Sequence, residues 1–187
     1  MVVGLGCPDG RLWGKARGLS GSYPVLCHML DTAAMAGVLW DVLLGEGTRA
    51  RIAEALGLSV GDARSAVSFW AGLHDLGKIS PGFQAQVPEA FSLLRDDPVY
   101  RVAGGVEGLA VLRHETASHW ALAELLAQEG YPQGRRRPSG RQLLRDAVSH
   151  QVAQLLGGHH GVFGEVLKTD RQMDHLRRRV VGRLSQR

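Results

Sequence analysis

The sequence predicts an all-α protein, a helical bundle with irregular connections. Apolar side chains recur at helical spacing in several segments, which glycine, proline and polar residues separate. No alternating pattern typical of a strand runs for any length, valine- and isoleucine-rich runs are missing, and no internal repeat is evident. The chain has 187 residues, 44% of them hydrophobic, so we expect one domain with a real core over residues 1–187.

The first half of the chain is expected to hold three helices behind an irregular, glycine-rich start. Glycines after an apolar-periodic segment end a helix, and serine, threonine or aspartate before one begins it. Proline suits the first helical turn. The predicted segments are an irregular lead-in over 1–22, and helices over 24–44, over 48–56 with Thr48 as cap, and from Ser59 or Asp62 to Gly77.

The second half follows the same rules, with longer polar connections. The predicted segments are a turn over 80–82, short helical pieces near 83–95, a loop around 104–108, a helix over 114–128, an arginine-containing loop over 130–140, a helix over 141–156 that Ser139 caps, and a last helix from 165 to the C-terminus.

The charge of the chain is moderately basic, with a net charge of +4 and a pI of about 9.5. Arginines cluster over 135–145 and 171–187, which suits a polyanionic partner, although a solvated helix face explains such runs equally well. No stretch approaches the roughly 20 apolar residues of a membrane span, and the start lacks the pattern of a signal peptide. Cys7 and Cys27 have no metal-type spacing and form no disulfide framework. We therefore expect a cytoplasmic protein that does not use a membrane.

A histidine and an aspartate stand together at the end of the third predicted helix. His74 and Asp75 are about 100° apart around a helix axis, so they can address one ion, and the carboxylate can bridge to a second. His28 and Asp31 lie three residues apart and therefore share a helix face. Asp31 either orients His28 or His74 or is an ordinary polar residue near a helix start.

Three more histidines lie near the ends of later helices. His114 begins one helix, and His159 and His160 follow a Gly-Gly stop, where the backbone can aim both rings inward. Imidazoles and one carboxylate from distant helices can hold two metal ions in a bundle core. Two ions about 3.5–4 Å apart suit phosphate ester hydrolysis, and imidazole-rich sites favour Fe, Co, Ni, Mn or Zn over Mg or Ca.

Four short motifs, in order, resemble those of one family. They are His28-x-x-Asp31, "LHDLGKISPGFQAQ" over 73–86, "RHETAS" over 113–118 and "GGHHG" over 157–161. Together they resemble the HD superfamily of metal-dependent phosphohydrolases. More narrowly, they resemble the HD nuclease domain of the CRISPR-associated nuclease-helicase of type I systems. The resemblance covers about residues 20–165, and its weight comes from the order of the four motifs.

The resemblance implies a two-metal site in which Asp75 is shared. By it, His28, His74 and Asp75 would bind one ion, and Asp75, His114, His159 and His160 the other, with Asp75 central to catalysis. It also implies cleavage of single-stranded DNA that a helicase portion of the same protein feeds in. Recruitment by the RNA-guided CRISPR surveillance complex is implied as well.

One departure from the family's pattern concerns a later aspartate ligand. The superfamily completes its site with an Asp on a further helix, and in the CRISPR branch that residue comes well after the double His. Here only Asp170 and Asp174 follow Glu165 as acids, and both stand in a charged segment, so we expect neither to be a ligand. The chain is therefore expected to be a fragment of a longer nuclease-helicase, which leaves its own activity open.

Further residues are expected to contact substrate. Lys78 is expected to neutralise phosphate charge in catalysis, against the alternative of a plain cation at a helix C-terminus. Ser118 lies one turn after His114 and is a candidate substrate contact, and Arg135 and Arg136 are candidates to guide the strand. Phe83 either stacks a base or, as the more common role, packs in the core.

The leading hypothesis is thus a metal-dependent nuclease that cleaves single-stranded DNA in CRISPR interference. Two alternatives stay open. One is an HD phosphohydrolase that acts on a nucleotide or cyclic nucleotide, with the same metal site in a closed pocket. The other is a docking domain without catalysis, whose site is incomplete.

Overall fold

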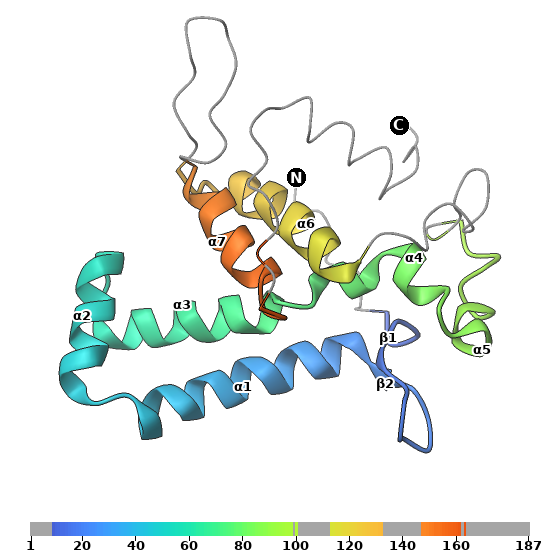
Figure 1. Cartoon of the computed structure of the whole chain (residues 1–187), viewed down its shortest axis with the longest axis horizontal. Helices are drawn as coiled ribbons and strands as arrows, with labels where there is room; N and C mark the ends of the chain where they lie inside the picture. The colour runs from blue at the N-terminus through green and yellow to red at the C-terminus, as the bar shows by residue number, and fades with distance from the viewer. Residues whose placement is uncertain (1–8, 99, 101–112, 133–146, 162, 164–187) are drawn as a thin grey trace, which may run out of the picture.

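A computed structural model of the chain describes residues 9–98, 100, 113–132, 147–161 and 163 (Figure 1). The predicted all-α class is confirmed, because helices make up most of the described structure and only one small sheet accompanies them within the described residues. The elements in chain order are β1 Trp13–Lys15, β2 Tyr23–Pro24, α1 Val25–Leu43, α2 Glu46–Leu56, α3 Val60–Leu73, the 3₁₀ helix η1 Leu76–Ile79, α4 Pro81–Gln84, α5 Pro88–Phe91, α6 His114–Gln128 and α7 Val148–Gly157.

Two helical pairs make up the domain. Helices α1 and α3 lie side by side as a long hairpin, which α2 closes at one end, and α6 packs beside α7 (Figure 1). The short η1 connects the pairs, since it continues from α3 and packs against α6. Residues at the end of the α1–α3 hairpin therefore meet residues of α6 and α7.

The predicted irregular lead-in instead contains a small antiparallel sheet. Strands β1 and β2 pair with Trp13 opposite Pro24 and Lys15 opposite Tyr23, and an irregularity interrupts the register. Strands of two and three residues are too short to show an alternating pattern. The backbone N–H of Val25 donates to the Leu12 carbonyl at 2.8 Å, so the start of α1 is tied to the sheet.

The bounds of two early helices follow backbone geometry as much as side-chain signals. Helix α2 begins at Glu46 rather than at Thr48, because the Gly45 carbonyl already accepts from the Thr48 N–H at 2.9 Å. Helix α3 begins as predicted after Ser59, whose hydroxyl accepts from the Asp62 N–H at 3.1 Å.

Helix α3 ends at Leu73, earlier than the predicted stop at Gly77. Asp75 leaves the helical conformation, with φ −101° and ψ 17°, and the chain tightens into η1. Gly77 is needed at this point for space. A Cβ there would lie 2.0 Å from the His114 carbonyl oxygen and 2.4 Å from the Ser118 nitrogen. The absence of a side chain thus brings η1 directly onto α6.

Several other expectations concern residues beyond the described ones. Helix α6 has the predicted bounds of 114–128, whereas α7 begins at Val148 and not near residue 141, because Ala147 is extended, with φ −84° and ψ 127°. The expected loop around 104–108 and the last helix from 165 lie outside the described residues. So do Arg135, Arg136, Asp170 and Asp174.

Helices α6 and α7 meet through a second close contact. A Cβ on Gly157 would lie 2.7 Å from the Cβ of His119, so only glycine lets α7 pack this closely. His119 is buried here, with its ring edge-on to His150 at 6.3 Å between centroids. Burial, helped by the neighbouring His150, lowers the pKa of His119 from 6.5 to about 4.

Helix α1 has an apolar outer side. Within the described residues it is the one helix whose length and composition would allow it to cross a membrane, a test that core helices also pass. Its inner residues Gly37 and Trp40 are buried, and the helix packs along α3. The exposed apolar side chains of α1 are Leu30, Met35, Val38, Leu39, Val42 and Leu43.

We predict that Gly77→Ala destabilises the domain by at least about 2 kcal/mol, because the new methyl group would collide with the backbone of α6. Gly61→Ala is the matched control. Gly61 lies inside α3 with only the Ser59 hydroxyl at 4.0 Å from a built Cβ, so alanine there should stabilise the helix slightly. Urea unfolding followed by circular dichroism measures both. Equal effects of the two substitutions would contradict the close contact.

We predict that His119 makes the domain acid-sensitive. Its folded pKa is depressed, so the unfolded chain binds a proton as the pH falls below 6.5, while the folded protein does not until about pH 4. The free energy of unfolding should therefore fall across this window, by about 3 kcal/mol from this residue. In His119→Gln this part of the loss disappears. Urea unfolding of the wild type and of His119→Gln at pH 7 and pH 4, with chelator present, measures the loss of unfolding free energy in each protein. Equal losses in the two proteins would refute the prediction.

Candidate metal centre

Asp75 lies at the centre of the candidate site, buried between the two helical pairs. One of its oxygens, Oδ2, faces the α1–α3 pair. It lies 2.7 Å from His28 Nε2 on α1, 3.0 Å from His74 Nε2 at the end of α3, and 2.7 Å from the Nζ of Lys78 on η1. His28, His74 and Asp75 therefore form one group of ligand atoms, all within 4.8 Å of one another.

The other oxygen, Oδ1, faces the α6–α7 pair. It lies 3.2 Å from His114 Nε2 at the start of α6 and 3.3 Å from His159 Nε2 after α7. His160 joins on the outer side, with its Nε2 at 3.3 Å from His114 Nε2. His114, His159 and His160 form the second group within 4.8 Å. The structure thus brings together all six ligands that the sequence predicts, and Asp75 stands between the two groups.

Two of these imidazoles are oriented by carbonyls at helix ends. His74 Nδ1 donates to the Ala71 carbonyl at 2.8 Å, and His159 Nδ1 donates to the Leu156 carbonyl at 2.7 Å. Each carbonyl also accepts the backbone N–H of the same histidine at 3.3 Å, and its second lone pair accepts the bond from the ring. Each bond fixes the proton on Nδ1 and leaves the Nε2 lone pair aimed at Asp75.

The atoms that meet at the centre fit a divalent cation. Asp75 Oδ1 and His159 Nε2 are both buried, lie 3.3 Å apart and have no hydrogen-bond partner. Burial lowers the pKa of His159, which favours the neutral ring, so a nitrogen lone pair faces a carboxylate oxygen. A cation between them would satisfy both atoms. Imidazole nitrogens with one carboxylate form a donor set for transition metals rather than for Mg²⁺ or Ca²⁺.

The surroundings keep Asp75 ionised and His28 neutral. Burial tends to raise the pKa of Asp75, but contacts with His114, His74 and Lys78 together hold it far below the usual range. Burial lowers the pKa of His28, against the opposing effect of its bond to Asp75. A charged carboxylate with neutral imidazoles is the protonation state that metal binding requires.

Glu115 is a second carboxylate beside the α6–α7 group, and the sequence motifs indicated no role for it. It is mostly buried, its Oε2 lies 3.3 Å from His114 Nδ1, and its Oε1 lies 3.8 Å from His160 Nε2. Burial tends to raise the pKa of Glu115, whereas Arg113, 2.7 Å away, lowers it. The net effect is a lowered pKa. The Oε2 of Glu115 makes no hydrogen bond within the described residues, so Glu115 acts on His114 through its negative charge. In the sequence, the signal for a role of Glu115 was its position directly after the candidate ligand His114.

Gln84 joins the N-terminal strand to the site, a second role that sequence reasoning missed. Its buried amide accepts from the Trp13 N–H at 3.1 Å and donates to the Trp13 carbonyl at 2.9 Å and the Lys78 carbonyl at 2.7 Å. Lys78 Nζ in turn donates to the Gly14 carbonyl at 3.2 Å. The signal for this role was the Phe-Gln pair in the motif over 73–86. The role itself could be recognised only from the position of β1 in the structure.

The structure contradicts the expected substrate contact of Ser118 and decides between the two alternatives for Asp31. Ser118 is fully buried and its hydroxyl accepts from the Gly77 N–H at 2.8 Å, so it fixes η1 on α6 and is not exposed to substrate. Asp31 accepts a hydrogen bond from the Tyr23 hydroxyl on the exposed side of α1, so it orients neither His28 nor His74.

Phe83 has the expected packing role and also borders the site. It is buried, stacks on Trp13 at 4.4 Å between centroids, and meets the His114 ring edge-on at 5.3 Å. Lys78 Nζ lies 5.6 Å from the centre of the same ring.

Comparisons with known proteins agree with this arrangement. The family model described as "Cas3, HD domain" matches residues 13–183. The CRISPR-associated endonuclease/helicase Cas3 of Thermus thermophilus is 36% identical over 172 residues, which cover 89% of this chain and 16% of that protein. The CRISPR-associated nuclease/helicase Cas3 of Streptococcus thermophilus is 27% identical over 146 residues, covering 74% of this chain and 14% of that protein.

Solved structures give the same result. The crystal structure of T. fusca Cas3 matches with a TM-score of 0.67 and 37% identity, over 86% of this chain and 16% of that one. A chain of a CRISPR RNA-guided surveillance complex, pre-nicking, matches with a TM-score of 0.68 and 36% identity, over 86% of this chain and 17% of that one. This chain spans about one sixth of the length of the curated relatives it matches. With the family model matching most of its length, the chain belongs to the family of Cas3 HD domains.

Proposed function

We propose that this chain is the nuclease domain of a CRISPR-associated nuclease-helicase and that it hydrolyses phosphodiesters of single-stranded DNA with two divalent transition-metal ions. One observation carries the proposal. The two oxygens of the buried Asp75 carboxylate face two separate groups of imidazole nitrogens. A shared carboxylate between two nitrogen-rich groups suits a two-metal site.

The ligand atoms divide by helical pair. His28, His74 and Asp75 would hold one ion, and Asp75 with His114, His159 and His160 the other, with Fe, Mn, Ni, Co or Zn as candidates. Ions bound in such a pair activate water and offset the negative charge that builds on a phosphate. The carbonyl bonds of His74 and His159 hold their rings ready for this purpose.

Lys78 adds a fixed cation next to the same carboxylate. Its Nζ is held at 2.7 Å from Asp75 and by the Gly14 carbonyl at 3.2 Å, with the side chain mostly buried. A phosphate that reaches the centre would therefore meet a positive charge whose position costs no reorganisation. We assign Lys78 to charge neutralisation on the phosphate, and Arg135 and Arg136 to guidance of the strand.

The wider setting is inferred from the relatives. They carry the names endonuclease/helicase and nuclease/helicase and are about six times longer, so we propose that a helicase portion belongs with this domain and delivers the strand. A similar chain is part of a structure of a CRISPR RNA-guided surveillance complex, which supports such a complex as partner.

We predict that metal content follows the two ligand groups. The intact chain should bind two Mn²⁺, Ni²⁺ or Co²⁺ ions. His28→Ala and His159→Ala should each lose one, and Asp75→Ala should lose both, because one Asp75 oxygen faces each group of imidazoles. Elemental analysis after gel filtration gives the stoichiometry.

Asp31→Asn is the control for this measurement. Asp31 lies three residues from His28 but bonds to Tyr23, so its replacement should leave the metal content unchanged. Loss of an ion in Asp31→Asn, or two ions retained in Asp75→Ala, would contradict the ligand assignment.

We predict metal-dependent cleavage of circular single-stranded DNA, and its loss by at least about 100-fold in His74→Ala and Asp75→Ala. Circular dichroism should show that both variants keep their helices. Cleavage of nucleotides or cyclic nucleotides alone would overturn the nuclease proposal in favour of another phosphohydrolase. Cleavage at the wild-type rate by Asp75→Ala would contradict the proposed bridging role of Asp75.

A further inference from the structure

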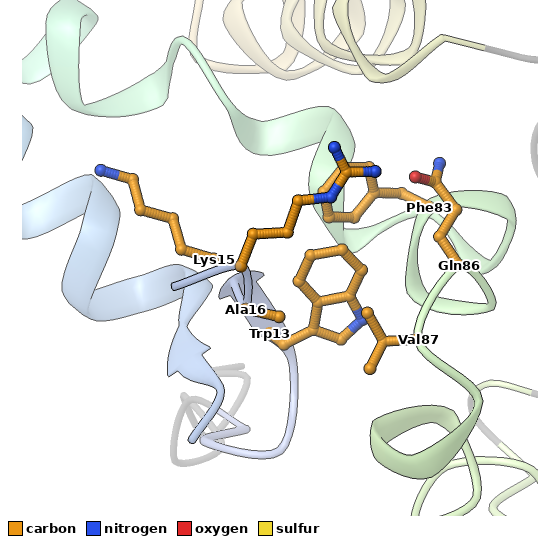
Figure 2. Close-up of a pocket in the computed structure, with 7 residues that line it drawn as sticks. Trp13, Lys15, Ala16, Phe83, Gln86 and Val87 are labelled. Atoms are coloured by element: carbon orange, nitrogen blue, oxygen red, sulfur yellow. The ribbon is translucent and has the colours of Figure 1, made fainter. Parts of the chain in front are cut away.

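An open pocket lies beside the metal centre and is separated from it by one aromatic ring. It has a volume of about 320 Å³ and lies between the N-terminal strand and the segment after α4 (Figure 2). Trp13, Phe83 and Val87 form its apolar wall, and Lys15, Arg17 and Gln86 complete the lining with polar groups. None of the residues that line it is acidic.

We propose that this pocket receives one unpaired nucleobase of the bound strand, next to the nucleotide that is cleaved, while Lys15 and Arg17 contact the adjoining phosphates. This inference rests on the proposed function, since it assigns a substrate subsite to the same nuclease. It adds a reason for preferring single-stranded over double-stranded DNA.

The pocket and the metal centre share Phe83 as a wall. On one side the ring stacks on Trp13 at 4.4 Å, and on the other it meets His114 edge-on at 5.3 Å and lies 5.6 Å from Lys78 Nζ. A strand whose phosphate lies near His114 and Lys78 therefore has the pocket within reach of its next nucleotide.

Strand β1 brings the rim cations to the same place. Lys15 follows Gly14, whose carbonyl accepts from Lys78, and a Cβ on Gly14 would lie 3.4 Å from the Cβ of His28. The Lys15 side chain extends away from Trp13 in Figure 2 and is exposed, as is Arg17. Exposed cations at a rim without acids favour a phosphate backbone.

The chemistry of the pocket suits a base. Trp13 is held on both sides of its backbone by Gln84, and its indole N–H donates to the Gln84 carbonyl at 3.0 Å, so the aromatic wall is rigid. Aromatic walls accept every base, because every base has a π-face. The exposed Gln86 amide offers donors and an acceptor, so it can pair with the edge of any base.

The size of the pocket sets what can enter. Its volume lies at the lower end of the roughly 300–1,000 Å³ of small-molecule sites, which leaves room for one nucleotide and not for a base pair. Only a base that has left its partner and its stack can enter. A double strand would thus lose this contact.

Binding of an oligothymidine of about eight nucleotides to chelator-treated protein, followed by fluorescence anisotropy, tests the cations. The double variant Lys15→Ala/Arg17→Ala should bind at least about ten-fold more weakly. Arg49→Ala/Arg51→Ala on α2, at the far end of the α1–α3 hairpin, removes the same charge and should change little (Figure 1). Equal losses in both double variants would overturn the proposal.

A strand of the same length without bases tests the pocket itself. The wild type should bind it several-fold more weakly than oligothymidine. Val87→Trp, which fills the pocket from a half-buried position, should bind both strands alike and keep the wild-type circular dichroism spectrum and melting temperature. Equal affinity of the wild type for the strands with and without bases would contradict the proposal that a base occupies the pocket.

Cleavage by the wild type, run in parallel with Mn²⁺, separates this inference from the proposed function. If the wild type cleaves and Lys15→Ala/Arg17→Ala has an unchanged KM, the pocket proposal fails while the nuclease stands. If the wild type binds with the expected base preference but cleaves no DNA, the subsite stands as a binding site and the nuclease proposal fails.

Discussion

The structure depends on one buried carboxylate that must be compensated from all sides. Removing a charge from water is costly unless partners replace the lost solvation. For Asp75, His28 on α1 and Lys78 on η1 supply these partners to Oδ2, while Oδ1 faces the imidazoles at the ends of α6 and α7, where a cation would supply the remaining compensation. The two helical pairs are therefore held in the one arrangement that encloses Asp75, and Gly77 and Ser118 provide the close contact that this enclosure requires.

The chemistry of the site was visible in the sequence because it depends on residue types that are rarely placed together by chance. His28, His74, Asp75 and the later histidines could be recognised from their order. Ser118 and Asp31 could not be judged in this way, because their spacing fixed only a helix face and left open which neighbour fills it. Gln84 and Glu115 act through contacts with distant or adjoining partners, and no periodicity marks such contacts.

In the fold, too, local features could be predicted from the sequence and long-range contacts could not. Helix α6 was predicted to the residue and α3 was begun correctly by its Ser59 cap, since apolar spacing and capping are local properties. The end of α3 at Leu73 and the start of η1 result from the approach of α6, which is not encoded nearby. Strand β1 pairs with β2, and Gln84, far along the chain, holds it through both backbone groups of Trp13.

The order of the ligands along the chain also decides when the centre can come into existence. His28 belongs to the first helix and His159 and His160 follow the last described one, so the meeting of the two groups of candidate ligands requires contacts between the two ends of this region. Such long-range contacts form late in folding. During synthesis on the ribosome, the two groups of candidate ligands would face each other only after the double histidine has emerged and packed, so an ion that needs both groups would bind after this packing.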